Sequence, residues 1–320
     1  MSSEPSHESA PGPRVEAIDA ARGLALVGMF VFHFAWDLAY FGFIAPEFPF
    51  RPGFMLFGHS VATTFLALAG ASLVLASRGG MNWGKYWRRL AMIVAGALAV
   101  TGATWRLFPD SFIFFGILHC IAAGSLLALA FLRAPAWQTN AVAAAIIAAP
   151  FLWTSPVFDA PWLLWTGLGE SEPRSNDLRA FFPWAGFLIA GLGLARVLPA
   201  TGVTARIAAW RAGYRFSRAL TWGGRHSLLV YLVHQPALYG LVWLAAAAAP
   251  PEEANYMSAC VPPCLSAGGT AAYCASACAC VVKQTKMENL WSKVQRDNLT
   301  PLETTRFEAI GRVCAREAQP

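Results

Sequence analysis

The chain has 320 residues, of which 56% are apolar and only 13% are charged, and its mean hydropathy is +0.46. A soluble globular domain carries about 25% charged residues, so this composition excludes an ordinary soluble enzyme and predicts a surface that mostly faces lipid. The formal net charge is +6. The basic residues gather in a few short loops, which indicates membrane orientation rather than nucleic-acid binding.

The N-terminal segment differs from the rest of the chain. Residues 1–16 are polar and rich in Ser, Pro and Glu, which predicts a disordered segment. The first apolar run starts at Gly23 and is too long for the apolar region of a signal peptide, so we expect no cleaved leader.

Apolar runs follow one another from Gly23 onward, each near the length of about 20 residues that a helix needs to cross a bilayer. Backbone polar groups inside a bilayer must be satisfied within their own segment, and strand alternation is absent, so each run predicts a helix. The expected fold class is all-α, a polytopic transmembrane bundle of about seven spans. The third, fifth and sixth runs are short, which predicts tilt, a kink or shifted boundaries. The runs are 23–44, 54–77, 90–105, 112–132, 137–153, 181–198 and 228–249.

Lysines and arginines in short loops predict the orientation of the chain. The loops after the second and sixth runs are strongly basic, and Arg133 marks the loop after the fourth. All three loops share one side when seven spans are counted. We therefore expect a multi-pass membrane protein with an inside N terminus and an outside C terminus. The basic residues of the two main loops are Arg78, Lys85, Arg88, Arg89, Arg196, Arg206, Arg211, Arg215, Arg218 and Arg225.

From Pro250 the chain becomes polar and holds six of its seven cysteines. Two Cys-x3-Cys motifs each place their cysteines on one helical face, so disulfides between them would staple a helical hairpin, as expected outside the cytoplasm. A zinc site with four cysteine ligands is the rival; the charge count favours disulfides and leaves their pairing open. The expected organisation is a disordered segment 1–16, a transmembrane domain 17–249 and a cysteine-rich tail 250–320. The six cysteines are Cys260, Cys264, Cys274, Cys278, Cys280 and Cys314.

Ionisable residues follow one face of the first span. Steps of three and four residues align Arg22, His33 and Asp37 over about 22 Å. Such groups are costly inside a span and usually face a bundle interior or a wet cavity. An aspartate one turn from a histidine can fix its tautomer, which predicts His33 as a general base and Asp37 as its orienting partner. The alternative is structural, with Asp37 at the interface and His33 in an interhelical hydrogen bond.

Further polar residues lie toward the same end of the predicted spans. His119 lies near one end of the fourth span and His59 near the corresponding end of the second. Together with His33 they would converge on an outward-facing cavity, with His119 in a catalytic role and His59 and Arg106 binding substrate. Each residue alone has a structural alternative, and Arg106 beside Asp110 is equally compatible with a surface ion pair.

Several familiar catalytic signatures are absent from the sequence. It contains no Walker A motif, no dinucleotide fingerprint, no HExxH and no GxSxG. A soluble-type nucleotide fold is therefore not indicated, and no metal is expected.

Ordered motifs give the sequence a family resemblance. They are RVEAIDAARGLAL from Arg14, HFAWDL from His33, FLALAG at 65–70, FGILH at 115–119, and FPW at 182–184 with Gly191. In this order, over roughly residues 14 to 240, the chain resembles the heparan-α-glucosaminide N-acetyltransferase catalytic-domain family in its bacterial branch. The cysteine tail lies outside the resemblance.

The resemblance implies a membrane acetyltransferase. Lysosomal members take acetyl groups from cytosolic acetyl-CoA and pass them to a terminal glucosamine on the luminal side. Aligned at Arg22 and Gly23, His33 occupies the place of their active-site Asn, and Ile44 that of their catalytic His, while residues 45–53 contain no His. Either His33 takes over the role, or the chemistry differs, or activity is lost.

The expected function is transfer of an acetyl or other acyl group from cytosolic acyl-CoA to an amino sugar or envelope glycan outside. Arg22, Arg88 and Arg89 would meet the CoA phosphates, although a cationic rim also follows from membrane orientation alone. The expected partners are the lipid bilayer, acyl-CoA and a sugar or glycolipid acceptor, without nucleic acid; homo-oligomerisation is left open. The alternatives are a proton-coupled transporter, since intramembrane His and Asp suit proton relays, and a non-catalytic scaffold that docks through its tail.

Overall fold

The computed structural model describes residues 15–248, 251–295 and 297–318, and every regular element in them is helical. The all-α prediction is therefore confirmed for this part of the chain. Two compact units divide it: a bundle unit, Met1–Phe32 with Pro52–Pro236, and a tail unit, His33–Arg51 with Ala237–Pro320. Each unit is described by itself below.

Four helices are long and apolar enough to cross a membrane. The third predicted run, 90–105, proves to be part of a 25-residue helix, so its short length reflected a misplaced boundary. Asn82 caps this helix, because its side-chain oxygen accepts a hydrogen bond from the Lys85 N–H at 2.9 Å. The four helices are α1 (Glu16–Tyr40), α2 (Pro52–Ser77), α3 (Trp83–Leu107) and α9 (Ser227–Ala248).

Three shorter apolar helices complete the apolar set of the described residues. The fourth predicted run begins as a helix only at Ile117, because the residues before it pair with a distant loop: Phe115 O accepts from the Arg179 N–H at 2.9 Å. Only the four longer helices meet the length requirement, so the count of about seven spans stays a prediction. The shorter helices are α4 (Ile117–Ala130), α5 (Ala136–Leu152) and α6 (Phe181–Val197).

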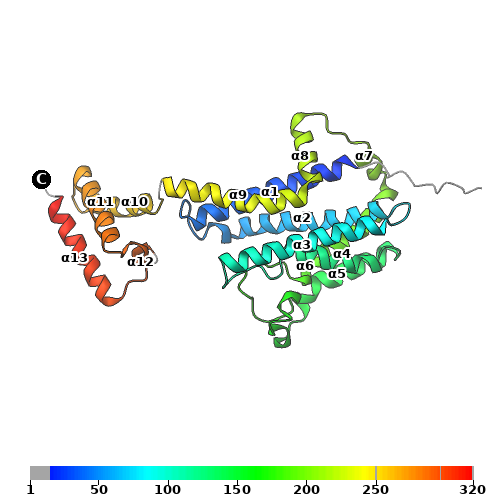
Figure 1. The fold of residues 1–320 in the computed structure, drawn as a ribbon, viewed down its shortest axis with the longest axis horizontal. Coiled ribbons are helices and arrows are strands. Elements are labelled where there is room, and N and C mark those ends of the chain that lie inside the picture. The colour runs from blue at the N-terminus through cyan, green and yellow to red at the C-terminus, as the bar shows by residue number, and fades with distance from the viewer. Residues whose placement is uncertain (1–14, 249–250, 296, 319–320) are drawn as a thin grey trace, which may run out of the picture. The chain divides into compact units, whose positions relative to one another are not determined.

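Helix α6 lies at the centre of the bundle unit, packed against α2, α4 and α5. Its residues Leu188, Ile189 and Leu192 are fully buried. A Cβ added at Gly191 would lie 2.1 Å from the carbonyl oxygen of Ala67, so α2 and α6 meet backbone against backbone, as small residues permit in membrane bundles. Figure 1 shows α2 to α6 running side by side.

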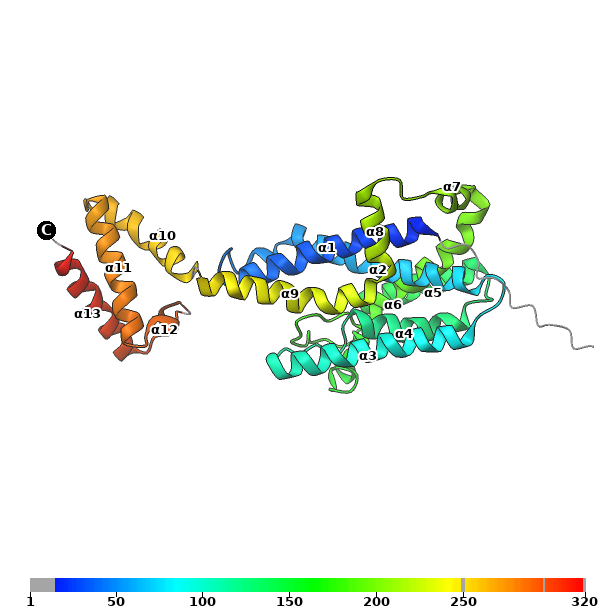
Figure 2. The same cartoon turned by 45° about the horizontal axis from the view of Figure 1, so that its top comes forward.

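The remaining elements of the bundle unit connect α6 to α9 or fill loops. Helix α8 runs across the direction of α2 and of the start of α1 in both views (Figures 1 and 2). These connecting elements are α7 (Val203–Ala209), α8 (Arg215–Arg225) and the 3-10 turns η2 (Pro156–Asp159), η3 (Leu164–Thr166) and η4 (Leu198–Thr201). The tail unit contains one further turn, η1 (Phe48–Phe50).

Disulfides hold the helices of the tail together. Cys260–Cys278 and Cys264–Cys274 join α10 to α11, and Cys280–Cys314 joins α11 to α13. The two Cys-x3-Cys motifs thus staple a helical hairpin, and no group of three or more His, Cys, Asp or Glu in the described ranges is placed to hold a metal ion. The tail helices are α10 (Pro251–Ser266), α11 (Ala271–Met287), α12 (Trp291–Gln295) and α13 (Pro301–Glu317).

Candidate functional site

The Asp-x-x-Arg-Gly motif forms an ionic network at the start of α1. Asp19 is only 5% exposed; its carboxylate accepts a hydrogen bond from Arg22 at 3.1 Å and lies 3.5 Å from the guanidinium of Arg225 on α8. Arg22 also donates to the hydroxyl of Ser72 on α2. The network therefore ties α1, α2 and α8 together with charge-assisted hydrogen bonds.

Two glycines bring α1 and α8 into backbone contact. A Cβ at Gly23 would lie 2.1 Å from a carbonyl oxygen of α8, and one at Gly224 would lie 1.7 Å from the carbonyl oxygen of Asp19. Glu16 adds a further link, because its carboxylate accepts a hydrogen bond from the Ala212 N–H at 3.0 Å. The start of α1 and the α7–α8 segment thus form one tightly packed joint.

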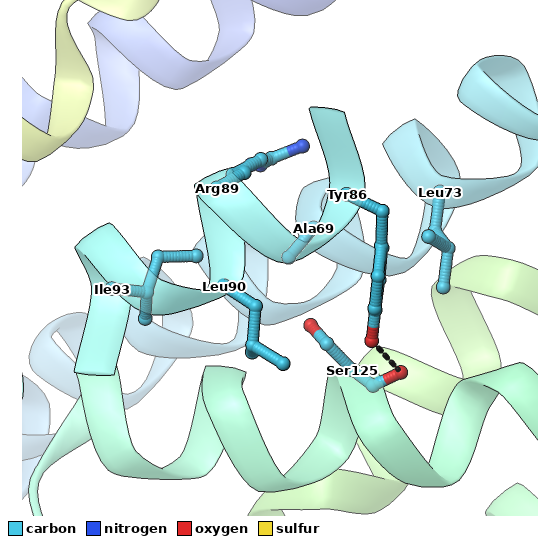
Figure 3. A pocket seen from close by; sticks show the side chains of 7 residues that line it. All are labelled: Ala69, Leu73, Tyr86, Arg89, Leu90, Ile93 and Ser125. Carbon is cyan, nitrogen blue, oxygen red and sulfur yellow. Dashed lines mark hydrogen bonds between the residues drawn. The ribbon is translucent and has the colours of Figure 1, made fainter. Parts of the chain in front are cut away.

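A small pocket lies between α2, α3 and α4 (Figure 3). Its polar residues are Tyr86, Arg89 and Ser125, and the Tyr86 hydroxyl donates to the carbonyl oxygen of Ser125 at 3.2 Å. Leu73 forms part of its apolar wall and directly follows Ser72, which binds Arg22. The pocket therefore lies at the end of the bundle where α1 begins. Its cavity volume is only about 30 Å³, enough for about one water molecule and far below the roughly 300–1,000 Å³ of a small-molecule site.

His119 is held at the start of α4. Its Nδ1 accepts a hydrogen bond from the Gly116 N–H at 3.2 Å, which places the proton on Nε2. That Nε2 lies 3.3 Å from the hydroxyl of Thr101 on α3, and the hydroxyl itself donates to the Ile113 carbonyl at 2.7 Å. The imidazole is therefore neutral in this arrangement and caps the helix, and its Nε2–H donates to the Thr101 hydroxyl.

An aromatic–ionic cluster, His59, Phe115, Asp177, Arg179 and Trp184, adjoins His119. The Arg179 guanidinium stacks over the Trp184 ring at 4.9 Å and lies 3.3 Å from the Asp177 carboxylate. The His59 ring meets Trp184 edge to face at 5.3 Å, and Phe115 lies 5.6 Å from the His119 ring. The structure thus brings two predicted site histidines, His59 and His119, to the same end of the bundle unit.

His33 and Asp37 lie one turn apart on α1, as the sequence predicts. Asp37 is 3% exposed and His33 is half-buried. Ile44, which the resemblance aligns with the catalytic His of lysosomal members, follows the end of α1 at Tyr40 and lies outside any helix. His33 is the one histidine that α1 carries.

A model of a protein family, described as heparan-alpha-glucosaminide N-acetyltransferase, catalytic, matches residues 14–236. The chain belongs to this family. The matched range contains the ionic network, the pocket, the aromatic–ionic cluster and His33 with Asp37, and it ends before the cysteine tail. No curated protein and no solved structure matches the chain.

Members of this acetyltransferase family use acetyl-CoA as the acetyl donor. Of the residues expected to bind CoA, Arg89 lines the pocket, Arg88 is exposed beside it on α3, and Arg22 faces a carboxylate and a hydroxyl instead. Arg106 is exposed in the last turn of α3. No ion pair joins it to Asp110 among the residues that the structure describes.

Sequence reasoning missed several polar residues of these sites. Asp177 and Arg179 belong to a loop of mixed charge that gave no periodic signal, although Arg179 stands just before the family motif FPW. Tyr86 falls in the basic loop before the third predicted run, and Ser125 falls within the fourth run as an ordinary span residue. Only tertiary packing shows that they share a pocket with Arg89.

Proposed function

We propose that the chain is a membrane acetyltransferase that moves an acetyl group from cytosolic acetyl-CoA to an amine or hydroxyl of an amino sugar or envelope glycan on the opposite side. The family match over residues 14–236 carries the proposal. We place the protein in the bacterial inner membrane with a cytoplasmic N terminus. A periplasmic tail would supply the oxidising surroundings in which its disulfides persist.

On the donor side, Arg88 and Arg89 would bind the CoA phosphates. Arg89 lines a pocket with an apolar wall, and guanidinium groups suit phosphate recognition. Arg22 is a poorer phosphate ligand than these two, because a phosphate there would compete with the Asp19 carboxylate at 3.1 Å.

On the acceptor side, His33 would act as the general base and Asp37 would orient it. The acceptor N–H or O–H gives its proton to His33 while its nitrogen or oxygen bonds to the thioester carbonyl carbon. The C–S bond then breaks, and the CoA sulfur leaves with the electron pair and takes up a proton. His119 would exchange its Nε2–H hydrogen bond to Thr101 for one to the acceptor or the thioester carbonyl, and His59 and Arg106 would bind the acceptor.

Reconstituted protein tests this mechanism. Proteoliposomes would receive radiolabelled acetyl-CoA with a pool of amino sugars and envelope extract, using the wild type, His33→Ala and His7→Ala. His7→Ala is the matched control, since it removes a histidine outside the family match. We expect His33→Ala to slow label transfer by about 100-fold or more, as removal of a general base does, and His7→Ala to leave the rate unchanged.

The same experiment has outcomes against the proposal. Unfolding temperatures near the wild-type value would first show that both variants are folded. Normal transfer by His33→Ala would then remove His33 as the base. No transfer by the folded wild type, in an extract known to contain acceptors, would favour the proton-coupled carrier, which the ionisable pair on α1 suits equally well.

A further inference from the structure

Helix α8 has two different faces. One face carries Thr221 and Gly224, which are buried, and this face packs against the start of α1. The opposite face carries Arg215, Arg218 and Trp222, all exposed. Trp222 is 60% exposed, so a large aromatic ring and two guanidinium groups share a face that no described helix covers.

The position of α8 places this face at the boundary of the bilayer. Gly224 contacts Asp19 in the first turn of α1, and α9, a candidate span, begins at Ser227 directly after α8. Both views show α8 lying across the direction of α2 and of the start of α1 (Figures 1 and 2). A helix that crosses the spans where they begin lies in the plane of the membrane interface.

Charge distinguishes this face from the joint with α1. Arg225 pairs with carboxylates of α1, whereas none of the ion pairs of the described residues includes Arg215 or Arg218. The segment 198–226 contains no Asp or Glu at all. Tyr214 and Phe216 add aromatic rings that are 84% and 69% exposed. Arginines among interfacial aromatics match the chemistry of anionic lipid headgroups.

We propose that α8 is a binding site for anionic phospholipids at the bilayer surface where α1 begins. Arg215 and Arg218 pair with lipid phosphates, and Tyr214, Phe216 and Trp222 lie among the headgroups and glycerol backbones. The lipid binds the exposed face of the helix whose other face holds the Asp19 network. This site is independent of acetyl transfer.

A fluorescent label on α8 tests the site directly. Six cysteines are in disulfides and Cys120 is buried, so under non-reducing conditions a thiol label reacts with an added Ala219→Cys on the exposed face of α8. The labelled protein is placed in phosphatidylcholine nanodiscs that contain a minor, equal fraction of brominated phosphatidylglycerol or brominated phosphatidylcholine. We expect stronger quenching by the anionic lipid, with a local enrichment of about fivefold for each arginine.

Charge-matched variants assign the preference to α8. Arg215→Gln with Arg218→Gln should bring quenching by the two lipids to the same level, while Lys283→Gln with Arg316→Gln, an equal charge loss in the tail, should leave the preference intact. High salt should weaken the preference of the parent protein, which tests the site without any charge variant.

Three results would overturn the proposal. Equal quenching by both lipids in the parent protein would show no anionic preference, and absence of quenching by either lipid would show that α8 does not lie at the interface. Loss of the preference on adding inorganic phosphate, but not an equal ionic strength of chloride, would identify a site for free phosphate instead of lipid.

Discussion

Asp19 shows at the scale of a single residue what the family motif does in this fold. A buried carboxylate loses its hydration, and Arg22 and Arg225 offset that loss by pairing with it from α1 and α8. Local sequence explains the first pair, since the two residues are three apart. The second partner comes from a segment some 200 residues later, which no periodic pattern indicates.

Asp19→Asn should therefore destabilise the protein strongly. It removes the carboxylate from Arg22 and leaves Arg225 paired with Glu16 alone at 3.9 Å, and breaking a buried pair typically lowers the free energy of unfolding by about 3–5 kcal/mol. Thermal unfolding in detergent measures the effect. Glu308→Gln is the control, because it breaks an exposed pair with Arg312 at 3.8 Å and should cost less than about 1 kcal/mol. Equal effects of the two variants would contradict a structural role for Asp19.

Arg89 on α3 is expected to bind the phosphates of acetyl-CoA. Arg89→Gln should raise the KM for acetyl-CoA with little change in kcat, because it removes a charge that binds the phosphates equally in the ground and transition states. Lys85→Gln removes the same charge one turn earlier on α3, at a residue that does not line the pocket. An equal rise in KM for both variants would mean that the basic residues at the start of α3 act only as a diffuse positive surface and that Arg89 has no specific role.

Close backbone packing governs the arrangement of elements. Helices α2 and α6 meet at Gly191, and α1 and α8 meet at Gly23 and Gly224. In a bilayer, lipid tails are as apolar as side chains, so such close contacts take the place of the hydrophobic driving force between helices. A methyl group at one of these positions must push two helices apart.

Gly224→Ala and Gly102→Ala should change stability in opposite directions. The first places a methyl group 1.7 Å from a backbone oxygen and should lower the free energy of unfolding by about 1–3 kcal/mol or more. The second meets nothing within 4 Å on α3, and its higher helix propensity should stabilise by up to about 1 kcal/mol. The unfolding temperatures of the two variants test this expectation. An unchanged unfolding temperature in Gly224→Ala would mean that α8 can move away from α1 at no cost.

The helices themselves were largely predictable, because each apolar run in the sequence corresponds to a helix. Their ends were less so. Helix α4 begins at Ile117 because the preceding residues pair with the loop that contains Arg179, and a local apolar pattern cannot report a partner so distant. Helix α8 gave no apolar run to find, since its exposed face carries arginines. The clusters around Arg179 and Arg89 combine residues from distant segments, so only the tertiary structure shows them.

The whole molecule combines the family domain with a tail of different character. The tail core is small, formed by Val281, Leu290, Ile310 and Cys314, and a core of this size rarely stabilises a fold without staples such as disulfides. A carboxylate at the surface, Glu303, also stabilises the tail. Lys293 and the Thr300 N–H both donate to Glu303 and lower the pKa of its carboxyl to about 2.

We therefore expect the local stability of α13 to fall at acidic pH. Because the pKa of Glu303 is lower in the folded tail than its usual 4.5, its contribution to stability is complete above pH 4.5 and disappears as the pH falls toward 2. Hydrogen exchange of α13 peptides, corrected for the intrinsic effect of pH, should show loss of protection in this window. Glu303→Gln should flatten the profile and Glu308→Gln on the same helix should not; an unchanged profile in Glu303→Gln would contradict the assignment.

The joint between α1 and α8 has a consequence for biosynthesis. Glu16 and its partner Ala212 are 196 residues apart along the chain, a stretch that a ribosome completes in roughly 10–40 s at about 5–20 residues per second. During that time the first helix is already made, while the segment that pairs with its Glu16 and supplies the second partner of Asp19 does not yet exist. The acidic start of the nascent first helix therefore stays hydrated at the membrane surface until the α7–α8 segment has been synthesised. The native contacts between α1 and α8 form only after nearly all helices of the bundle exist.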